Sequence, residues 1–294
     1  MIGVINLDKP VGPTSHDMVG LVRRLTGMSR IGHAGTLDPL ASGVLPILVG
    51  GATRLSEELT GGRKRYEAVV RLGYRSETDD SQGPIEAGSP PPDVATVRAA
   101  LGAFSGTFDQ MPPTYSARKQ AGVSAHRAAR KGAPVALQPR SVTVYDLSLT
   151  NAVADGDWLD VTLAMETAAG TYVRSIARDL GNRLGCGGYL RSLRRTAAAG
   201  LTAGDARTPA DLEALAAEGR LGEALIPVEQ LLELPVLLLD EEQARRFANG
   251  GAVAWSALDA PPDERVLVRD VRGLLGTGAV TDGTLRPRKV LVRS

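Results

Sequence analysis

Alternation of apolar and polar side chains at every second position is the feature that most constrains how this chain can fold. It occurs in YEAVVRLGYRS (66–76), SVTVYDLSL (141–149) and WLDVTLAMET (158–167). In the first of these, one face is shared by Tyr66, Ala68, Val70, Leu72 and Tyr74. A strand with one apolar face needs a second layer to cover it. Because helical patterns lie between these strands, we predict an α+β fold with a mixed β-sheet flanked by helices.

Each predicted helix has a polar residue that can cap its first turn. Thr14 or Ser15 precedes a stripe of apolar residues at helical spacing, and Gly27 ends that helix. Asp93 precedes a second stripe in residues 94–104. We expect Thr171 to cap the helix in GTYVRSIARDLGNRLG, and Thr208 to begin another helix.

The spacing of the predicted helices and strands changes at Pro235. A strand, a helix capped by Asp240 and three short strands (RVLVRD, LLGTGAV and KVLV) follow within about 60 residues. Closely spaced short strands are typical of small β domains that curl to protect their edges. We therefore predict two domains, residues 1–232 and residues 235–294, the second with a barrel-like sheet.

Cysteine content and hydropathy exclude several protein classes. Cys186 is the single cysteine, so an intramolecular disulfide and a thiolate metal cluster are excluded, which fits a reducing compartment. The N-terminus meets charge at Asp8 and Lys9 and lacks the apolar core of a signal peptide. No apolar run approaches the roughly 20 residues needed to span a bilayer. We expect a cytoplasmic protein that does not associate with membranes.

Charge is distributed unevenly along the chain. Residues 1–204 hold 23 basic and 18 acidic residues, whereas residues 205–294 hold 11 and 15. Residues 110–145 contain six basic residues and no acidic one, and form a long segment rich in Gly and Pro without a clear period. Such a cluster suits a polyanionic partner, although a solvated face would give the same pattern.

One carboxylate stands alone in an apolar segment. Asp38 lies in RIGHAGTLDPLASGVLPILVG (30–50), where an unpaired charge would cost several kcal/mol. The nearest metal-ligand candidate is His33, five residues away, and no other acid is close, so we predict no metal site. A turn cap before Pro39 would also explain an aspartate here.

Arg174 breaks a local rule in a way that could explain Asp38. It falls in the first turn of its predicted helix, where a cation opposes the helix dipole at a cost of about 0.3–1 kcal/mol. Departures of this kind tend to mark functional sites. Arg174 could reach Asp38 and keep the carboxylate ionised in a dry pocket. Alternatively, it could be a solvent-exposed helix arginine, which is what we expect for Arg178.

Several motifs together resemble one enzyme family. GHAGTLDPLASGVL resembles the signature loop of the pseudouridine synthases, and most closely that of the TruB-type tRNA pseudouridine-55 synthases of bacteria. LDKPVGPTS, KRYEAVVRLG, MPPTYSARKQAG, GTYVRSIARDLG and YLRSLRRT resemble further family motifs in the same order. They span most of residues 1–200, whereas residues 76–110 match nothing distinctive. The C-terminal part is similar, more weakly, to a PUA-type RNA-binding domain.

The resemblance implies an activity and its catalytic residues. Family members isomerise uridine to pseudouridine in the T loop of tRNA at position 55, without cofactor or metal. By motif position, Asp38 would be the nucleophile, Arg174 its partner, and Tyr66 the residue that stacks on the base. Covalent catalysis by a carboxylate divides one difficult step into two easier ones.

The resemblance also implies how the RNA is held. His33 would fill the space left by a flipped uridine, and Leu193 and Tyr172 would contact that nucleotide. Lys64, Lys119 and the basic insertion at about 110–145 would hold phosphates of the T-arm stem-loop. We expect a monomer. The alternatives are a non-catalytic RNA-binding or tRNA-folding protein, or a synthase for another RNA uridine.

Overall fold

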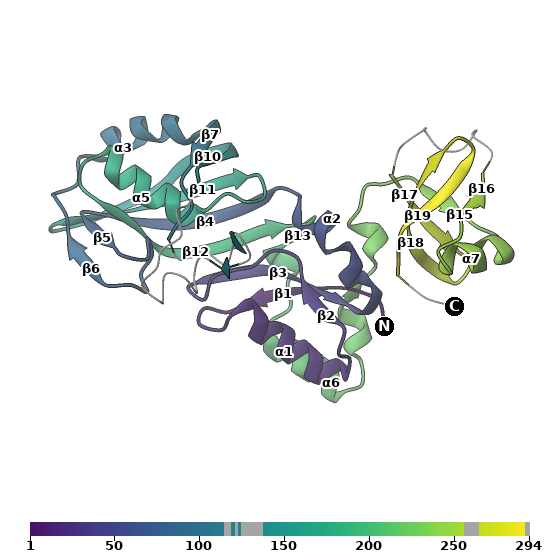
Figure 1. Ribbon diagram of the computed structural model, residues 1–294. Coiled ribbons are helices and arrows are strands. Elements are labelled where there is room, and N and C mark those ends of the chain that lie inside the picture. Colours follow the sequence, from purple (N-terminus) through teal and green to yellow (C-terminus); the bar gives the residue numbers. More distant parts are fainter. Residues whose placement is uncertain (115–118, 121–122, 125–137, 256–264, 292–294) are drawn as a thin grey trace.

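Ten strands in the described part of the chain form one large sheet (Figure 1). The computed structural model describes residues 1–114, 119–120, 123–124, 138–255 and 265–291. The strands of the large sheet are β1 (Gly3–Lys9), β2 (Ile31–His33), β3 (Ala41–Val49), β4 (Lys64–Leu72), β7 (Gly106–Gln110), β10 (Arg140–Asp155), β11 (Trp158–Thr167), β12 (Gly188–Ala198), β13 (Leu201–Thr202) and β14 (Leu225–Ile226).

The large sheet is mixed, as the sequence predicts. Its strands run in the order β14-β1-β3-β12-β4-β11-β10-β7, with β2 paired to β3 and β13 to β12. β3 and β12 are parallel, with Leu193 opposite Ala41, whereas the other pairs are antiparallel. Segments far apart in the sequence therefore lie side by side at the middle of the sheet.

β4 shows how alternation fixes one face of this sheet. Its buried positions are two apart and include Tyr66, opposite Met165 of β11 and Arg195 of β12. Contrary to our expectation, the strand does not continue to Tyr74. Gly73 has φ +98° and lies so near Asp157 that a side chain would not fit, so the chain turns there. Tyr74 instead begins β5 (Tyr74–Ser76), which pairs with β6 (Ile85–Ala87).

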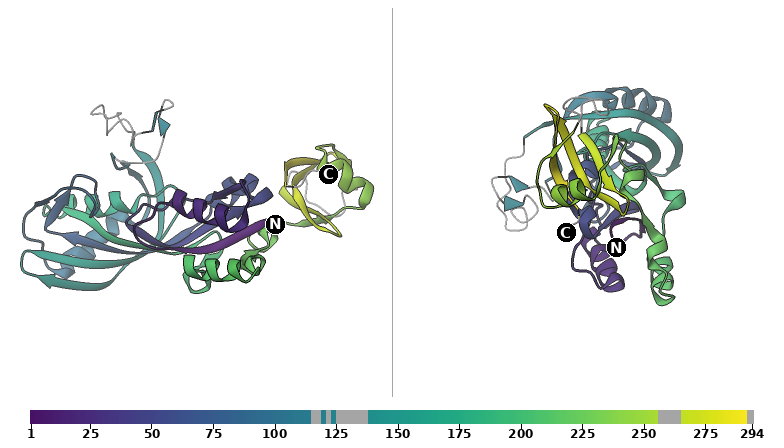
Figure 2. Two further views of the ribbon diagram at one scale, coloured as in Figure 1. Left: turned by 90° about the horizontal axis from the view of Figure 1, so that it is seen from below. Right: turned by 90° about the vertical axis from the view of Figure 1, so that its right-hand side faces the viewer.

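Helices flank the large sheet in two groups (Figures 1 and 2). α1 and α6 pack together beside β1 and β3, whereas α5 contacts β12 and β4, and α3 contacts β10. Thr14, Asp93 and Thr208 cap their helices as predicted. None of the helices in the described ranges is long and apolar enough to cross a membrane. These helices are α1 (Ser15–Thr26), α2 (Ser56–Thr60), α3 (Val94–Ala100), α5 (Val173–Arg183), α6 (Pro209–Ala217) and α7 (Glu241–Ala248).

The C-terminal strands form a separate sheet that curls into a half-barrel (Figure 2). α7 is capped by Asp240 as predicted and packs its Phe247 into a small apolar core. The last strand, which we predicted at KVLV, begins earlier in the chain, at Thr284. It pairs with the preceding strand, and Pro287 lies opposite Gly278 next to a register shift. The strands run in the order β15 (Val236–Leu238), β17 (Arg265–Asp270), β18 (Gly273–Thr281), β19 (Thr284–Val290) and β16 (Val253–Ala254).

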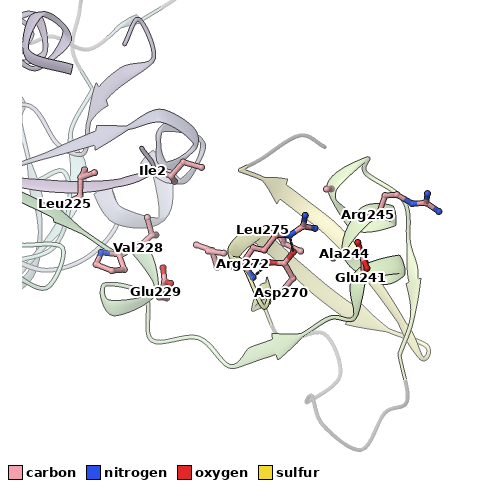
Figure 3. A pocket seen from close by; sticks show the side chains of 14 residues that line it. Ile2, Leu225, Val228, Glu229, Glu241, Ala244, Arg245, Asp270, Arg272 and Leu275 are labelled. Atoms are coloured by element: carbon pink, nitrogen blue, oxygen red, sulfur yellow. Dashed lines mark hydrogen bonds and ion pairs between the residues drawn. The ribbon is translucent and has the colours of Figure 1, made fainter. Parts of the chain in front are cut away.

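The C-terminal sheet contacts the rest of the chain through a shared cluster of buried apolar residues and through polar contacts. Lys289 of β19 pairs with Glu57 at 2.8 Å and with Glu58 at 3.1 Å, both on α2. Arg54 donates a hydrogen bond to the carbonyl of Val290. Next to this junction lies a cavity of about 720 Å³ with walls from both sheets (Figure 3).

The close approach of β3 to β12 yields a stability prediction. Gly43 has φ +101°, and a Cβ atom there would lie 2.2 Å from the backbone oxygen of Arg195. Gly43→Ala should therefore lower the free energy of unfolding by about 3 kcal/mol or more, measured by denaturant titration. Gly102→Ala is the matched control, because a Cβ atom at Gly102 meets nothing within 4 Å. Equal stability of the two variants would contradict this packing.

Candidate active site

A cavity of about 400 Å³ opens where β4, β12, the loop before β3 and the start of α5 meet. This volume is within the range of small-ligand sites. Asp38, Lys64, Tyr66, Tyr172, Arg174 and Leu193 all lie in its wall, so the structure brings together six of the eight residues that the sequence singled out. The other wall residues are Gly35, Thr36, Leu37, Thr60, Gly170, Thr171, Val173 and Arg195.

Asp38 and Arg174 form an ion pair with Nε and Oδ2 separated by 3.0 Å. The two side chains are buried to different extents. Arg174 is only 6% exposed, whereas Asp38 is 39% exposed. The expectation of a buried aspartate is therefore wrong, because the guanidinium is the buried member and the carboxylate lies where the cavity opens. A carboxylate held in this way stays accessible to a ligand.

The loop that carries Asp38 is anchored to α1. The Ser15 hydroxyl is buried, accepts a hydrogen bond from the Leu37 amide at 2.9 Å and donates to the Leu37 carbonyl at 3.0 Å. The Gly12 amide donates to the carbonyl of Pro39 at 2.8 Å. Hydrogen bonds on both sides of Asp38 thus fix the backbone from which the carboxylate projects.

Arg174 has a second carboxylate partner. Its Nε lies 3.7 Å from Oδ2 of Asp80, and its Nη1 donates to the Thr78 carbonyl at 3.3 Å. Asp80 is itself buried and accepts hydrogen bonds from the Thr78 hydroxyl and the Gln82 amide. Sequence reasoning missed Asp80, since residues 76–110 matched no motif. The turn at 78–82 thus contributes both a carboxylate and a carbonyl to the surroundings of the guanidinium.

Tyr66 forms part of the cavity wall on the apolar face of β4 and is nearly buried. Burial raises the pKa of its phenol, and the nearby Arg195 guanidinium opposes that rise. The phenol is therefore neutral at pH 7. Arg195 hydrogen-bonds to the phenol oxygen, which helps to fix the position of the ring.

Arg195 is a further residue that sequence reasoning did not assign. It is 1% exposed and donates hydrogen bonds to the carbonyls of Val44 at 2.7 Å, Gly35 at 3.0 Å and Thr36 at 3.5 Å. These bonds tie β12 to the loop that leads to Asp38. The signal was available in the sequence, because Arg195 is two residues after Leu193 and so shares its inward face.

A buried lysine lies behind the carboxylate. The Lys9 ammonium donates to the carbonyls of Pro10 at 2.8 Å and Pro13 at 2.7 Å. Burial lowers its pKa to about 8, and the negative charge of Asp38 acts against that shift. The KPVGPTS segment thus wraps its own lysine and places a cation close to Asp38.

Lys64 is not a surface contact of the kind we expected. Its side chain is buried, and its ammonium donates to the carbonyls of Thr60 at 2.7 Å and Gly62 at 3.1 Å. Burial lowers its pKa to about 8. The neighbouring Arg65 is exposed but forms an ion pair with Glu166 at 2.7 Å. A role for Lys64 in holding phosphate remains a prediction.

The structure does not bring His33 into the cavity wall and does not describe the side chain of Lys119. His33 is half-buried in β2, and burial lowers its pKa. Lys119 belongs to the short strand β8 (Lys119–Gln120), which pairs with β9 (Val123–Ser124), and its side chain lies outside the described part of the structure. The assigned roles of both residues remain predictions.

The start of α5 differs from the prediction in two ways. Tyr172, not Thr171, occupies the N-cap position, and its side chain makes no capping bond. Arg178, expected to be exposed, pairs with Asp79 and with Asp179, each at 2.8 Å. Burial raises the pKa of Asp79 against the opposing effect of Arg178. Within the described residues, no group of three His, Cys, Asp or Glu side chains could hold a metal ion.

Comparison with known proteins identifies the family. Residues 23–173 match the family profile described as TruB family pseudouridylate synthase (N terminal domain). The chain belongs to this family. Residues 174–233 match the tRNA pseudouridylate synthase B C-terminal domain, and residues 235–291 the C-terminal domain of pseudouridine synthase II TruB.

Curated relatives of this TruB-family chain cover almost its full length. The tRNA pseudouridine synthase B of Burkholderia lata is 43% identical over 99% of this chain and 90% of that protein. The protein of the same name from Rhodopseudomonas palustris is 41% identical over 98% of this chain and 80% of that protein.

Solved structures agree with the fold. The chain in a crystal structure of a Cbf5-Nop10-Gar1 complex superposes with a TM-score of 0.72 at 25% identity, covering 99% of this chain and 85% of that one. A chain from an H/ACA RNP bound to a substrate RNA gives the same TM-score at 23% identity. The large mixed sheet with flanking helices is thus the pseudouridine synthase fold.

The lowered pKa of Lys64 predicts a pH dependence of stability. Its pKa is about 8 in the folded protein and higher when unfolded, so between these values the unfolded state binds more protons. The free energy of unfolding should rise with pH from about 8 to about 10.5, by on the order of 3 kcal/mol for this group. Lys64→Met should remove that part of the rise, as measured by urea titration at several pH values.

Lys289→Met serves as the control for this measurement. Hydrogen bonds to Glu57 raise the pKa of Lys289, the opposite direction to Lys64. Its removal should leave the rise between about pH 8 and about pH 10.5 in place. Equal curves for Lys64→Met and wild type would show that burial does not disfavour the Lys64 ammonium.

Proposed function

We propose that this chain isomerises uridine to pseudouridine in tRNA, at position 55 of the T loop. The ion pair of Asp38 and Arg174 in the wall of a cavity carries the proposal, because it presents a carboxylate to a ligand-sized space in a chain of the TruB family. The curated relatives are named tRNA pseudouridine synthase B, which supports tRNA as the substrate.

The first chemical step would use the accessible oxygen atoms of Asp38. A carboxylate oxygen forms a bond to the anomeric carbon of the ribose, and the bond from that carbon to N1 of uracil breaks. The uracil leaves with the electron pair of that bond. Arg174 orients the carboxylate, and the bonds around Leu37 and Pro39 fix its backbone.

The second step returns the base to the same sugar through another atom. The uracil turns, its C5 carbon bonds to the anomeric carbon, and the bond from Asp38 to that carbon breaks. C5 then loses its proton to a base and N1 takes up a proton, so the product is an isomer of the substrate and the Asp38 carboxylate is regenerated. No oxidant, reductant or cofactor is required by this balance.

Tyr66 and Leu193 would hold the base during this rotation. Both lie in the cavity wall on adjacent strands, β4 and β12. Because burial raises its pKa, Tyr66 presents a neutral aromatic ring on which uracil can stack. The phenol can also exchange a proton with the base or the sugar.

Binding of the RNA would involve both predicted domains. In this proposal, residues 1–232 form the catalytic domain and residues 235–294 a PUA-like RNA-binding domain. The basic insertion, including Lys119, would hold phosphates, while Arg286 and Arg288 of β19 offer cations on the second sheet. His33 would fill the space left by the flipped uridine.

Asp38→Asn should abolish pseudouridine formation on a T-arm hairpin, because an amide oxygen is a far weaker nucleophile than a carboxylate. Affinity for the hairpin should stay within a few fold of wild type, since base and phosphate contacts are retained. Tritium release from C5-labelled uridine measures the reaction, and filter binding measures affinity. Turnover near the wild-type rate would remove Asp38 from its role. A wild-type protein that binds the hairpin without releasing tritium would favour the non-catalytic alternative.

Arg174→Lys should lose most of the activity although the charge is kept. A lysine ammonium is a point charge and cannot replace the planar guanidinium that Asp38, Asp80 and the Thr78 carbonyl surround. We expect a fall in kcat of roughly 100-fold with a smaller change in KM. Arg191→Lys, an exposed arginine on β12, is the control and should retain activity. Unchanged rate constants in Arg174→Lys would contradict the pairing.

A further inference from the structure

The basic insertion leaves the sheet beside the start of α5. Gln110 at the end of β7 pairs with Arg140 at the start of β10, and this is the last pair before the two strands separate. Gln110 is buried, with 2% of its surface exposed. A buried amide at the base of an insertion needs partners for both its donor and its acceptor.

Gln110 finds both partners on the backbone of Tyr172. Its Oε1 accepts from the Tyr172 amide at 2.9 Å, and its Nε2 donates to the Tyr172 carbonyl at 3.0 Å. Tyr172 is the N-cap of α5 and supplies no capping side chain of its own. The first amides of a helix need an acceptor from outside it. Gln110 thus holds the N-cap residue of α5 from another strand, through both the amide and the carbonyl of that residue.

The next residue adds two contacts to the same helix. The carbonyl of Met111 accepts a hydrogen bond from the Ser175 hydroxyl at 2.8 Å and from Nη2 of Arg178 at 2.9 Å. Arg174 lies between Tyr172 and Ser175, in the first turn of α5. The base of the insertion is therefore bonded to the helix on both sides of the arginine that holds Asp38.

We propose that Gln110 is a positioning residue for catalysis, which sets the first turn of α5 and through it the Arg174 guanidinium against Asp38. The inference rests on the proposed function for its effect on rate, but the placement of Arg174 can be measured without any reaction. Gln110 also connects the base of the basic insertion, which we expect to bind RNA, with Asp38. The connection runs through Tyr172 and Arg174 in the first turn of α5.

Two substitutions of similar size separate hydrogen bonding from packing. Gln110→Met keeps the length of the side chain and removes both hydrogen bonds. We expect kcat for the T-arm hairpin to fall roughly 10- to 100-fold, because small errors in orientation of a catalytic pair cost rate. KM should change by less than about threefold, because Gln110 itself does not line the cavity. The Nε–H resonance of Arg174 in a ¹⁵N spectrum, assigned by its loss in Arg174→Lys, should shift.

Gln110→Glu tests the donor separately. An ionised carboxylate can accept from the Tyr172 amide but cannot donate to the Tyr172 carbonyl, whereas the protonated acid can do both. Activity relative to wild type should therefore recover as pH falls from about 8 to about 6, because a buried carboxyl facing a carbonyl has a raised pKa. Gln110→Met should show no such recovery. A purely packing role for Gln110 would not produce this difference between the variants.

Asp109→Asn is the matched control, one residue away on β7 with an exposed side chain, and should behave as wild type. Wild-type kcat and an unmoved Arg174 resonance in Gln110→Met would overturn the inference. A lowered kcat that only follows a lower folded fraction, with the Arg174 resonance unmoved, would also overturn it. If wild type forms no pseudouridine but the resonance moves, positioning by Gln110 is supported and the proposed function fails.

Discussion

The burial of the Arg174 guanidinium is the constraint on which the rest of the site depends. A cation taken out of water must be compensated, and here the compensation comes from Asp38, Asp80 and the Thr78 carbonyl. Because Asp80 shares that task, Asp38 can remain partly exposed at the cavity and still be held in place. The same arrangement explains why a cation is tolerated in the first turn of α5, where the helix dipole opposes it.

A second buried guanidinium organises the opposite wall. Arg195 donates hydrogen bonds to the carbonyls of Gly35, Thr36 and Val44. It also hydrogen-bonds to the Tyr66 phenol. β12 therefore connects the loop before Asp38 with the aromatic ring that faces the cavity. The parallel pairing of β3 and β12 brings these segments together, although Asp38 and Arg195 are far apart in the sequence. Among the described charged residues that line the larger cavity between the two sheets, Asp270 alone is buried.

Local signals in the sequence predicted most of the helices and strands, but they did not predict which residues bond to the start of α5 or where β4 ends. Capping residues and alternation gave α1, α6, β4, β10 and β11, because these patterns depend on neighbours along the chain. The start of α5 was assigned the wrong cap, since the N-cap residue is Tyr172 and its backbone is held by Gln110, in another strand. The end of β4 was missed because Gly73 turns where Asp157 approaches it. Both errors arise from contacts between residues distant in sequence.

The sequence by itself determined that an aspartate, a tyrosine and an arginine lie in motifs of one enzyme family, and that a mixed sheet with helices presents them. Residue type, period and order along the chain suffice for this. Only the tertiary structure decided which member of the Asp38–Arg174 pair is buried, and that Asp80, Arg195 and Lys9 surround it. Burial and pKa depend on what packs around a group in three dimensions, and Asp80 belongs to a stretch with no recognisable motif. The chemistry was therefore encoded locally, whereas its electrostatic support was encoded by the fold.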